Sequence, residues 1–240
     1  ADGSQKDVRR DVNFVDYAYV WNATTETQDK SYTASSIAKS LYRYPGKWRR
    51  EWMALGFVDP NHTGVNYCPL RYADVVLMAA EAYNETNNTT EAWKLLNDVR
   101  QRAEATPITS ANYASLMKAP KVYNLDFIDD SDDAGKFRTA LYWERGFELC
   151  YEGQRKYDFL RWGCLGDALR AAQAYIESWY PDANEYINAS TLQSWDPVSW
   201  ASSNYVAGHN FVDGKHELYP IPLAEIQSNA ALNGQNNPGF

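Results

Sequence analysis

The sequence has few cysteines and no long apolar run, and each of these shortages excludes a class of protein. Three cysteines, Cys68, Cys150 and Cys164, occur in 240 residues, and no two of them form a Cys-x-x-Cys pair. Such a sparse, odd set excludes a disulfide framework and indicates small, partly buried thiols. The longest purely apolar run covers residues 75–80, which is too short to cross a bilayer.

Positive charge is also in short supply. Lys and Arg number 23 against 31 Asp and Glu, which gives a formal net charge of −8, and the pI is about 4.9. Because an acidic chain is a poor counterion for phosphate, we expect no nucleic-acid binding as its main role. The sequence begins without an initiator methionine or an apolar signal core. We therefore expect a chain that was processed or cut from a longer one.

The motifs of common catalytic and metal sites are missing as well. The chain contains no HExxH, Walker loop, GxGxxG or GxSxG, and its three histidines lie in polar stretches without a second ligand at metal spacing. The acidic run 129–133 resembles the start of a calcium loop, but Ala134 and Ala140 stand where that loop needs Gly and Glu. Negative charge at a helix N-terminus explains the run better. We expect neither a metal nor a cofactor.

Glu144, Glu148 and Glu152 form a row of carboxylates spaced one helical turn apart. One interpretation is a glycosidase, which needs two carboxyl groups flanking the scissile bond. Cations interleaved with the row, among them Arg145 and Arg155, favour instead an ion-paired helix with a structural role. We therefore expect the protein not to be an enzyme.

The sequence does contain a strong helical pattern from residue 70 onward. The pattern predicts helices over residues 70–85, 90–104, 134–161, 167–179 and 224–228, with Thr90 as an N-cap and an irregularity near Gly153. Residues 1–69 are loop-rich and aromatic, with alternations such as residues 12–17 that predict brief strands. The predicted fold is mainly α, with TPR-like antiparallel helix pairs, long irregular loops and a few short strands. We expect residues 1–69 to pack on a helical core of residues 70–240 as one continuous domain, truncated at its N-terminal side.

The first predicted helix pair has the residue spacing of a tetratricopeptide (TPR) repeat. The matching residues are Ala80, Tyr83, Ala92 and Leu96. Small residues let the two helices approach, and we expect Tyr83 and Leu96 to fill the groove between them. Because one such unit cannot bury its apolar face alone, it needs stacked neighbours. The spacing also supports an alternative function as a protein-interaction scaffold.

Three segments of the chain resemble the signatures of the SusD/RagB family. The first is residues 70–82 with 96–103, the second is residues 144–155 running into 158–163, and the third is residues 218–222 with 235–240. They occur in the family's order and cover most of residues 70–240. Gly146 departs from the pattern, because a second Arg is common there. Since family members are considerably longer, this chain resembles their C-terminal part.

The resemblance implies a lipoprotein of the outer membrane, exposed at the cell surface. It implies that the protein captures oligosaccharides or polysaccharides without catalysis and hands them to a SusC-like TonB-dependent transporter. The membrane would be contacted only through a lipid anchor that is absent from this chain. The signatures belong to the TPR scaffold and do not fix the ligand contacts. The alternative is a TPR-type scaffold that binds proteins and no glycan directly.

Aromatic residues supply the candidate ligand contacts, since 9 Trp, 18 Tyr and 8 Phe make up 15% of the chain. Sugar rings present apolar C–H faces that stack on exposed aromatic planes, while polar side chains bind their hydroxyl groups. Packing explains aromatics of the helices such as Tyr72, Tyr83 and Trp93, which leaves those on irregular segments. The candidate glycan-binding residues are Tyr19, Trp21, Trp48, Trp195 and Trp200, with Asn22 as a hydroxyl partner. The competing explanation for each aromatic is that it holds a loop in place.

Overall fold

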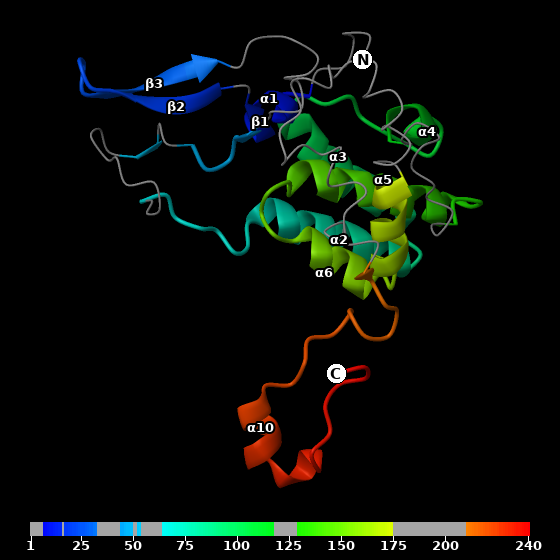
Figure 1. Cartoon of the computed structure of the whole chain (residues 1–240). Coiled ribbons are helices and arrows are strands. Elements are labelled where there is room, and N and C mark those ends of the chain that lie inside the picture. Colours follow the sequence, from blue (N-terminus) through cyan, green and yellow to red (C-terminus); the bar gives the residue numbers. More distant parts are fainter. Residues whose placement is uncertain are drawn as a thin grey trace. The chain divides into compact units, whose positions relative to one another are not determined.

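The structure is a computed structural model that describes residues 7–15, 17–32, 44–49, 52–53, 64–117, 129–174 and 210–240. It is rich in helix and has a few short strands, as the sequence predicts (Figure 1). The described residues form two units, one from those up to 117 together with 129–155, and one from residue 156 onward. No helix in these ranges is long and apolar enough to span a membrane. The predicted grouping of residues 1–69 and 70–240 stays a prediction.

Helices α2 (Tyr72–Glu85) and α3 (Thr89–Arg102) form the predicted helical hairpin, and α5 (Asp133–Glu148) contacts both of them (Figure 1). The side chain of Asn88 accepts a hydrogen bond from the backbone N–H of Glu91 at 3.4 Å. Asn88 is therefore the N-cap of α3, and the prediction of Thr90 in that role is wrong.

The core of this unit lies between the three helices. Ala80, Ala92 and Leu96 are completely buried, as the TPR spacing predicts, but Tyr83 is 42% exposed. Its predicted place in the groove between the helices is therefore wrong. The buried ring of Phe137 on α5 instead packs edge-to-face against Trp93 of α3, with 5.1 Å between ring centroids. A neighbouring helix thus covers the apolar face that one helical hairpin cannot bury alone.

The continuous helix predicted over residues 134–161 is wrong, because the structure has two helices there, but the predicted irregularity near Gly153 is confirmed. α5 ends at Glu148 and α6 (Arg155–Arg161) begins after a tight turn. Tyr151 and Gly153 in this turn have φ of 63° and 78°, a left-handed conformation that interrupts a helix. Asp132 accepts the Gly135 N–H at 2.7 Å and caps α5. Residues 165–174 are also helical, and the rest of the helix predicted over 167–179 lies outside the described residues.

Short elements precede the helical hairpin. α1 (Arg9–Asn13) leads into β1 (Phe14–Val15), which pairs antiparallel with β4 (Tyr44–Pro45). β2 (Tyr17–Asn22) and β3 (Thr27–Tyr32) pair as a separate hairpin. Brief strands are thus confirmed, although the stretch 12–17 predicted as extended begins as helix.

Gly46 brings the chain after β4 against the end of α1. Its N–H donates to the Asn13 carbonyl at 2.8 Å. A Cβ atom at this position would lie 2.0 Å from the Val12 carbonyl oxygen, so only glycine permits the approach. The close approach positions Lys47 and Trp48, which follow directly.

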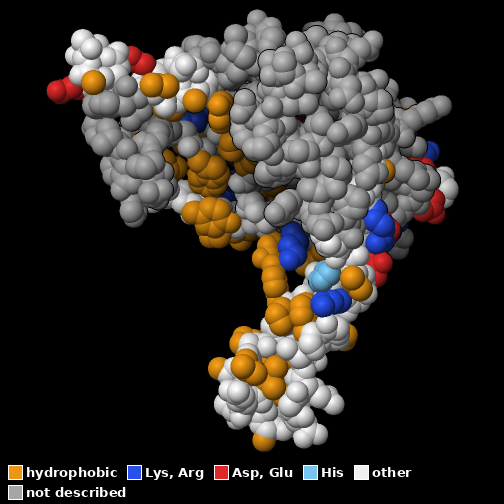
Figure 2. Space-filling view, viewed as in Figure 1, with side chains coloured by type: hydrophobic (Ala, Val, Ile, Leu, Met, Phe, Trp, Pro, Cys, Tyr) orange, Lys and Arg blue, Asp and Glu red, His pale blue; other side chains and the backbone are white. Residues whose placement is uncertain are grey.

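The C-terminal segment of the second unit is held by hydrogen bonds between its two ends. α10 (Leu223–Ser228) and the 3₁₀-helix η4 (Ala230–Leu232) lie between residues 218–222 and 235–240. Asn236 Oδ1 accepts the Ile221 N–H at 2.7 Å, and Asn237 Nδ2 donates to the Tyr219 carbonyl at 2.6 Å. The short helix predicted at 224–228 is confirmed, but none of its residues is buried, and Figure 2 shows hydrophobic side chains exposed on this segment.

Candidate functional site

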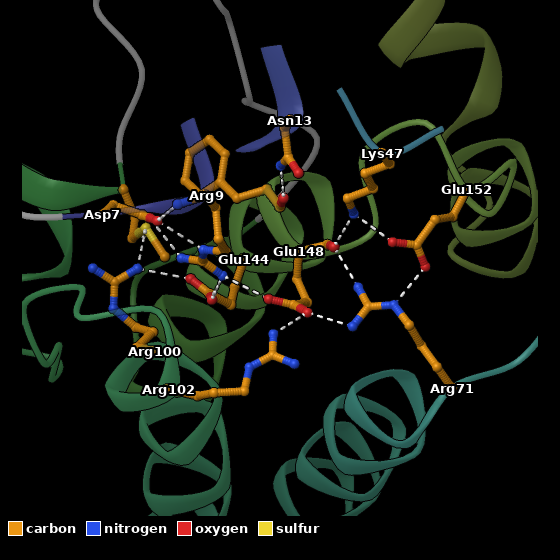
Figure 3. A network of polar contacts seen from close by, with 12 residues as sticks. Asp7, Arg9, Asn13, Lys47, Arg71, Arg100, Arg102, Glu144, Glu148 and Glu152 are labelled. Atoms are coloured by element: carbon orange, nitrogen blue, oxygen red, sulfur yellow. Dashed lines mark hydrogen bonds and ion pairs between the residues drawn. The ribbon is translucent and has the colours of Figure 1, made fainter. Parts of the chain in front are cut away.

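A network of ion pairs joins α5 to α1, α2 and α3 (Figure 3). Glu144 and Glu148 project from α5, and Glu152 lies in the turn after it. The three carboxylates bind five cations, which are Arg9, Lys47, Arg71, Arg100 and Arg102. Residues from four separate segments of the sequence therefore meet at one row of glutamates.

Backbone contacts fix the elements that carry these cations. The Val8 N–H, at the start of α1, donates to the Ala103 carbonyl after α3 at 3.1 Å. At the other end of α1, Asn13 Nδ2 donates to the Phe147 carbonyl of α5 at 2.8 Å. α1 is thus tied to both helices, which places Arg9 between them.

Glu144 and Glu148 are the buried centre of the network. Glu144 is completely buried and binds Arg9 and Arg100, the latter through Nη1 at 2.7 Å. Glu148 is also buried and binds Arg9 Nη1 at 3.2 Å, together with Arg71 and Arg102. Removing a carboxylate from water is costly unless cations and hydrogen bonds compensate its charge. Here every buried carboxylate of the row has at least two cationic partners.

The C-terminal end of α5 is bound by two further cations. Arg71 Nε donates to Glu152 at 2.6 Å, and Lys47 also binds that carboxylate. Lys47 Nζ donates in addition to the Glu148 carbonyl at 2.6 Å, and Arg71 Nη2 binds the same carbonyl. The last carbonyls of a helix lack partners within it and carry partial negative charge, so cations stabilise them.

The ion-paired role predicted for the glutamate row agrees with this geometry, but the predicted cationic partners are wrong. Arg145 lies 2.8 Å from Asp74 of α2, with both side chains buried. Arg155 donates instead to the Tyr142 carbonyl at 2.7 Å. Residues one position along a helix point about 100° away, so cations next to the glutamates in sequence face other neighbours.

Cationic partners also change the pKa values of two acids in the network. Burial opposes ionisation of Glu148, but hydrogen bonds from Arg102 and Arg71 and their charges outweigh it and hold its pKa below the usual 4.5. Burial also raises the pKa of Asp7, but the hydrogen bonds and charge of Arg9 lower it by more, so it lies below the usual 3.8. Both carboxyl groups are therefore ionised at neutral pH.

These lowered pKa values predict acid-induced loss of stability. A carboxylate with a lowered pKa in the folded state stabilises the fold above its unfolded-state pKa and loses that contribution as pH falls through the folded-state value. We expect the free energy of unfolding to fall as pH drops below about 4.5, measured by urea titration between pH 7 and pH 3. Glu148→Gln should be less stable at pH 7 and show a flatter decline. An equally steep decline in this variant would contradict the assignment.

An open cavity of about 310 Å³ lies beside the network. Trp48 and Trp52 line it together with Lys47, Arg71 and Arg102. Trp52 is 56% exposed. Trp48 stacks on Tyr67 with 5.8 Å between ring centroids, and its Nε1 donates to the Tyr151 carbonyl at 3.2 Å. The cavity thus combines two indole surfaces with charged hydrogen-bond donors.

A second cavity, of about 380 Å³, shares the lining residues Arg9 and Asn13 of α1 with the first. Phe14, Phe147 and Cys150 contribute to its wall. It has no indole among its lining residues in the described part of the chain, so the first cavity is the better candidate for sugar stacking.

Of the residues predicted from the sequence, Trp48 lies in the wall of the candidate cavity. Tyr19 and Asn22 lie on β2 and do not line it, and Trp21 lies on the same strand. Tyr19 packs edge-to-face on Tyr17 with centroids 5.6 Å apart. Trp195 and Trp200 fall outside the described residues. For all five residues other than Trp48, a role in glycan binding stays a prediction.

Asn22 is occupied by the turn between β2 and β3. Its Nδ2 donates to Asp29 at 2.6 Å, and its Oδ1 accepts the N–H groups of Thr24 at 3.0 Å and Thr25 at 3.3 Å. These bonds form an Asx-type turn, which gives Asn22 a structural role on the hairpin.

The residues of the cavity wall that sequence reasoning missed include Lys47, Trp52, Arg71 and Arg102. Trp52 had a detectable signal, because it follows Trp48 by four residues in the same aromatic, loop-rich stretch. The three cations had none, since each is an ordinary charged residue until the fold places it beside an indole.

Comparison with known proteins decides the family. The profile of the SusD family matches residues 2–240. The chain belongs to the SusD family. It is 31% identical over 172 residues to SusD-like protein P25 of Formosa agariphila, a match that covers 72% of this chain and 24% of that protein. It is 30% identical to SusD-like protein P2 of the same organism, covering 100% of this chain and 38% of the relative.

A solved structure shows the same fold. The crystal structure of a SusD homolog from Bacteroides thetaiotaomicron matches 98% of this chain with a TM-score of 0.63 and 27% sequence identity. That match covers 41% of the homolog. This SusD-family chain therefore spans between about a quarter and two-fifths of the length of these relatives.

Residues of the SusD signatures form the ion-pair network. Arg71, Arg100 and Arg102 belong to the first signature, and Glu144, Glu148 and Glu152 belong to the second. Their side chains bind one another across α2, α3 and α5. The signatures thus hold the scaffold together, as the sequence predicts.

Proposed function

We propose that this SusD-family protein binds oligosaccharides or polysaccharides without catalysis at the surface of the outer membrane, anchored there by a lipid. It delivers them to a SusC-like TonB-dependent transporter. The observation that carries the proposal is the cavity in which Trp48 and Trp52 lie beside Lys47, Arg71 and Arg102. Membership of the SusD family supports the class of ligand.

The cavity has the two features that sugar binding requires. An indole plane offers an electron-rich apolar surface to the C–H face of a sugar ring. Guanidinium and ammonium groups donate hydrogen bonds to hydroxyl and ring oxygens. The volume of about 310 Å³ lies at the small end of ligand pockets. It suits the end or a short stretch of a glycan.

The glutamate row supports a role without catalysis. A glycosidase needs one carboxyl group that donates a proton to the leaving oxygen and a second that reaches the sugar ring. Glu144, Glu148 and Glu152 are buried and bound to cations, and the pKa of Glu148 is lowered, which is the wrong direction for a general acid. Release of reducing ends from a polysaccharide by the protein would contradict this part of the proposal.

We expect Trp52→Ala to weaken glycan binding by about tenfold or more, because a stacked indole at the centre of a binding site is typically worth over 1 kcal/mol. Trp52 is the sharper test, since Trp48 also holds the Tyr67 and Tyr151 loops. Affinity gel electrophoresis against a broad glycan panel identifies the glycans bound, and calorimetry then measures their Kd. Tyr72→Ala, at an exposed α2 position outside the cavity, is the control. Unchanged affinity of Trp52→Ala for every bound glycan would exclude this cavity as the site.

The alternative function, a TPR-type interaction scaffold without direct glycan binding, is favoured by one feature. Tyr72, Val75 and Met78 lie three residues apart on α2, and all three are exposed, so one face of the helix carries apolar side chains. A scaffold predicts that Tyr72→Ala weakens capture of a protein partner and that no glycan binds.

Delivery is tested by co-purifying the protein with a TonB-dependent transporter from outer membranes, and its absence from such complexes would contradict delivery.

A further inference from the structure

We infer that the cavity lined by Trp48, Trp52 and Arg102 selects glycans that carry an anionic group, either a carboxylate or a sulfate ester. The inference rests on the proposed function, because it names the class of sugar for the same cavity. It follows from a charge imbalance in the cavity wall and from the position of one incompletely paired arginine.

Positive charge is in excess around the cavity although the whole chain is acidic. Among the described residues the network holds five cations, Arg9, Lys47, Arg71, Arg100 and Arg102, and four carboxylates, Asp7, Glu144, Glu148 and Glu152. Within this set the cations exceed the carboxylates by one, in a chain whose formal net charge is −8. Among residues that line the cavity itself, four cations face two carboxylates. An anionic ligand would supply the missing charge.

The excess charge is located at Arg102. Arg9 binds Asp7, Glu144 and Glu148, and Arg71 binds two carboxylates. Among the described carboxylates Arg102 binds only Glu148, which also binds two other arginines.

Arg102 is also the accessible member of the set. Its side chain is 57% exposed, whereas those of Arg9 and Arg100 are buried. Nη2 of Arg102 donates to Glu148, and Nε and Nη1 have no acceptor among the described residues. Arg102 lines the cavity and thus offers it a guanidinium group with two donor nitrogens that no described residue uses.

A guanidinium group with free nitrogens binds a planar or tetrahedral oxyanion more strongly than it binds a hydroxyl group. Two N–H groups of the fork can donate in parallel to two oxygens of one carboxylate or sulfate, and charge-assisted bonds of this kind are about twice as strong as neutral ones. A neutral sugar can accept the same hydrogen bonds but leaves the positive charge uncompensated. With its ring on an indole, an acidic sugar satisfies both features of the wall.

The test compares charged glycans with their neutralised forms. Polygalacturonate and alginate are measured against their carboxyl-reduced products, and dextran sulfate and carrageenan against dextran and desulfated carrageenan, with the full-length protein. We expect at least one charged form to bind about tenfold more tightly than its neutral counterpart at low salt. The difference should shrink at high salt, where charge interactions are screened. The carboxylate and sulfate arms distinguish the two sources of the anion.

Variants at Arg102 assign the preference to this site. Arg102→Gln should abolish the preference for the charged form and weaken binding of the neutral form far less than binding of the charged form, while Arg102→Lys should retain the salt dependence and part of the preference. Arg138→Gln is the matched control, because Arg138 is similarly exposed and pairs with Glu85 away from the cavity.

Three outcomes overturn the inference. The first is equal affinity for the charged and neutral forms of every glycan. The second is a preference for the charged form that survives in Arg102→Gln. The third is a preference that Arg138→Gln reduces as much as Arg102→Gln does. In each of these cases the proposed glycan binding stands. Failure to bind any glycan, charged or neutral, overturns the proposed function together with the inference.

Discussion

Glu144→Ala is expected to destabilise the unit built on α2, α3 and α5 by about 3–5 kcal/mol, because breaking a buried ion pair leaves an uncompensated charge. Glu144 is completely buried between Arg9 and Arg100, which are themselves buried. Removing the carboxylate leaves Arg100 without an anion, since Glu144 is its carboxylate partner in the described chain. Urea titration at pH 7 measures the change in the free energy of unfolding.

Two variants make this result specific to a buried pair. Glu144→Gln keeps the shape and one hydrogen-bond acceptor but loses the charge, so its loss of stability should lie below that of alanine. Glu85→Ala removes an exposed carboxylate that binds Arg138 at 2.7 Å and 2.8 Å. We expect this change to cost less than about 1 kcal/mol. Equal costs for Glu144→Ala and Glu85→Ala would show that the network contributes no more than a surface pair.

The network explains which parts of the fold the sequence predicts well. Helices α2, α3 and α10 follow from local patterns, such as apolar periodicity and the polar stretch before α3, and their predicted bounds agree to within two residues. An irregularity near Gly153 is predictable, but the end of α5 at Glu148 is not, because the glutamate spacing continues unchanged into Glu152. Only the backbone of Tyr151, with φ of 63°, shows that Glu152 reaches its cations from a turn.

The candidate site is less predictable for a related reason. Trp48 can be chosen from composition and context, because exposed loop tryptophan is uncommon and suits a sugar ring. Arg71 directly precedes α2 and Arg102 is the last residue of α3, and their sequence context indicates a scaffold. They line the cavity together with Lys47 and Trp48, which follow the close approach of Gly46 to α1. Tertiary structure alone places these cations beside the indoles.

Phe137→Ala is expected to cost about 3–5 kcal/mol in the same unit, the range for removing a fully buried aromatic ring. Phe137 is completely buried on α5 and packs edge-to-face on Trp93 of α3, with 5.1 Å between the ring centroids. Its removal leaves a cavity between two helices that close packing cannot readily refill. Urea titration at pH 7 gives the free energy of unfolding, and near-ultraviolet circular dichroism should report the changed surroundings of Trp93.

Tyr83→Ala is the matched comparison, because it removes an aromatic ring of similar size from α2. Tyr83 is 42% exposed, so we expect a cost below about 1 kcal/mol. The TPR spacing predicts the opposite order, since it assigns Tyr83 to the groove between α2 and α3. A larger cost for Tyr83→Ala than for Phe137→Ala would mean that the helical hairpin buries its own groove. A larger cost for Phe137→Ala instead requires α5 to complete the core of the helical hairpin. The ion pairs of the family signatures hold α5 in that place.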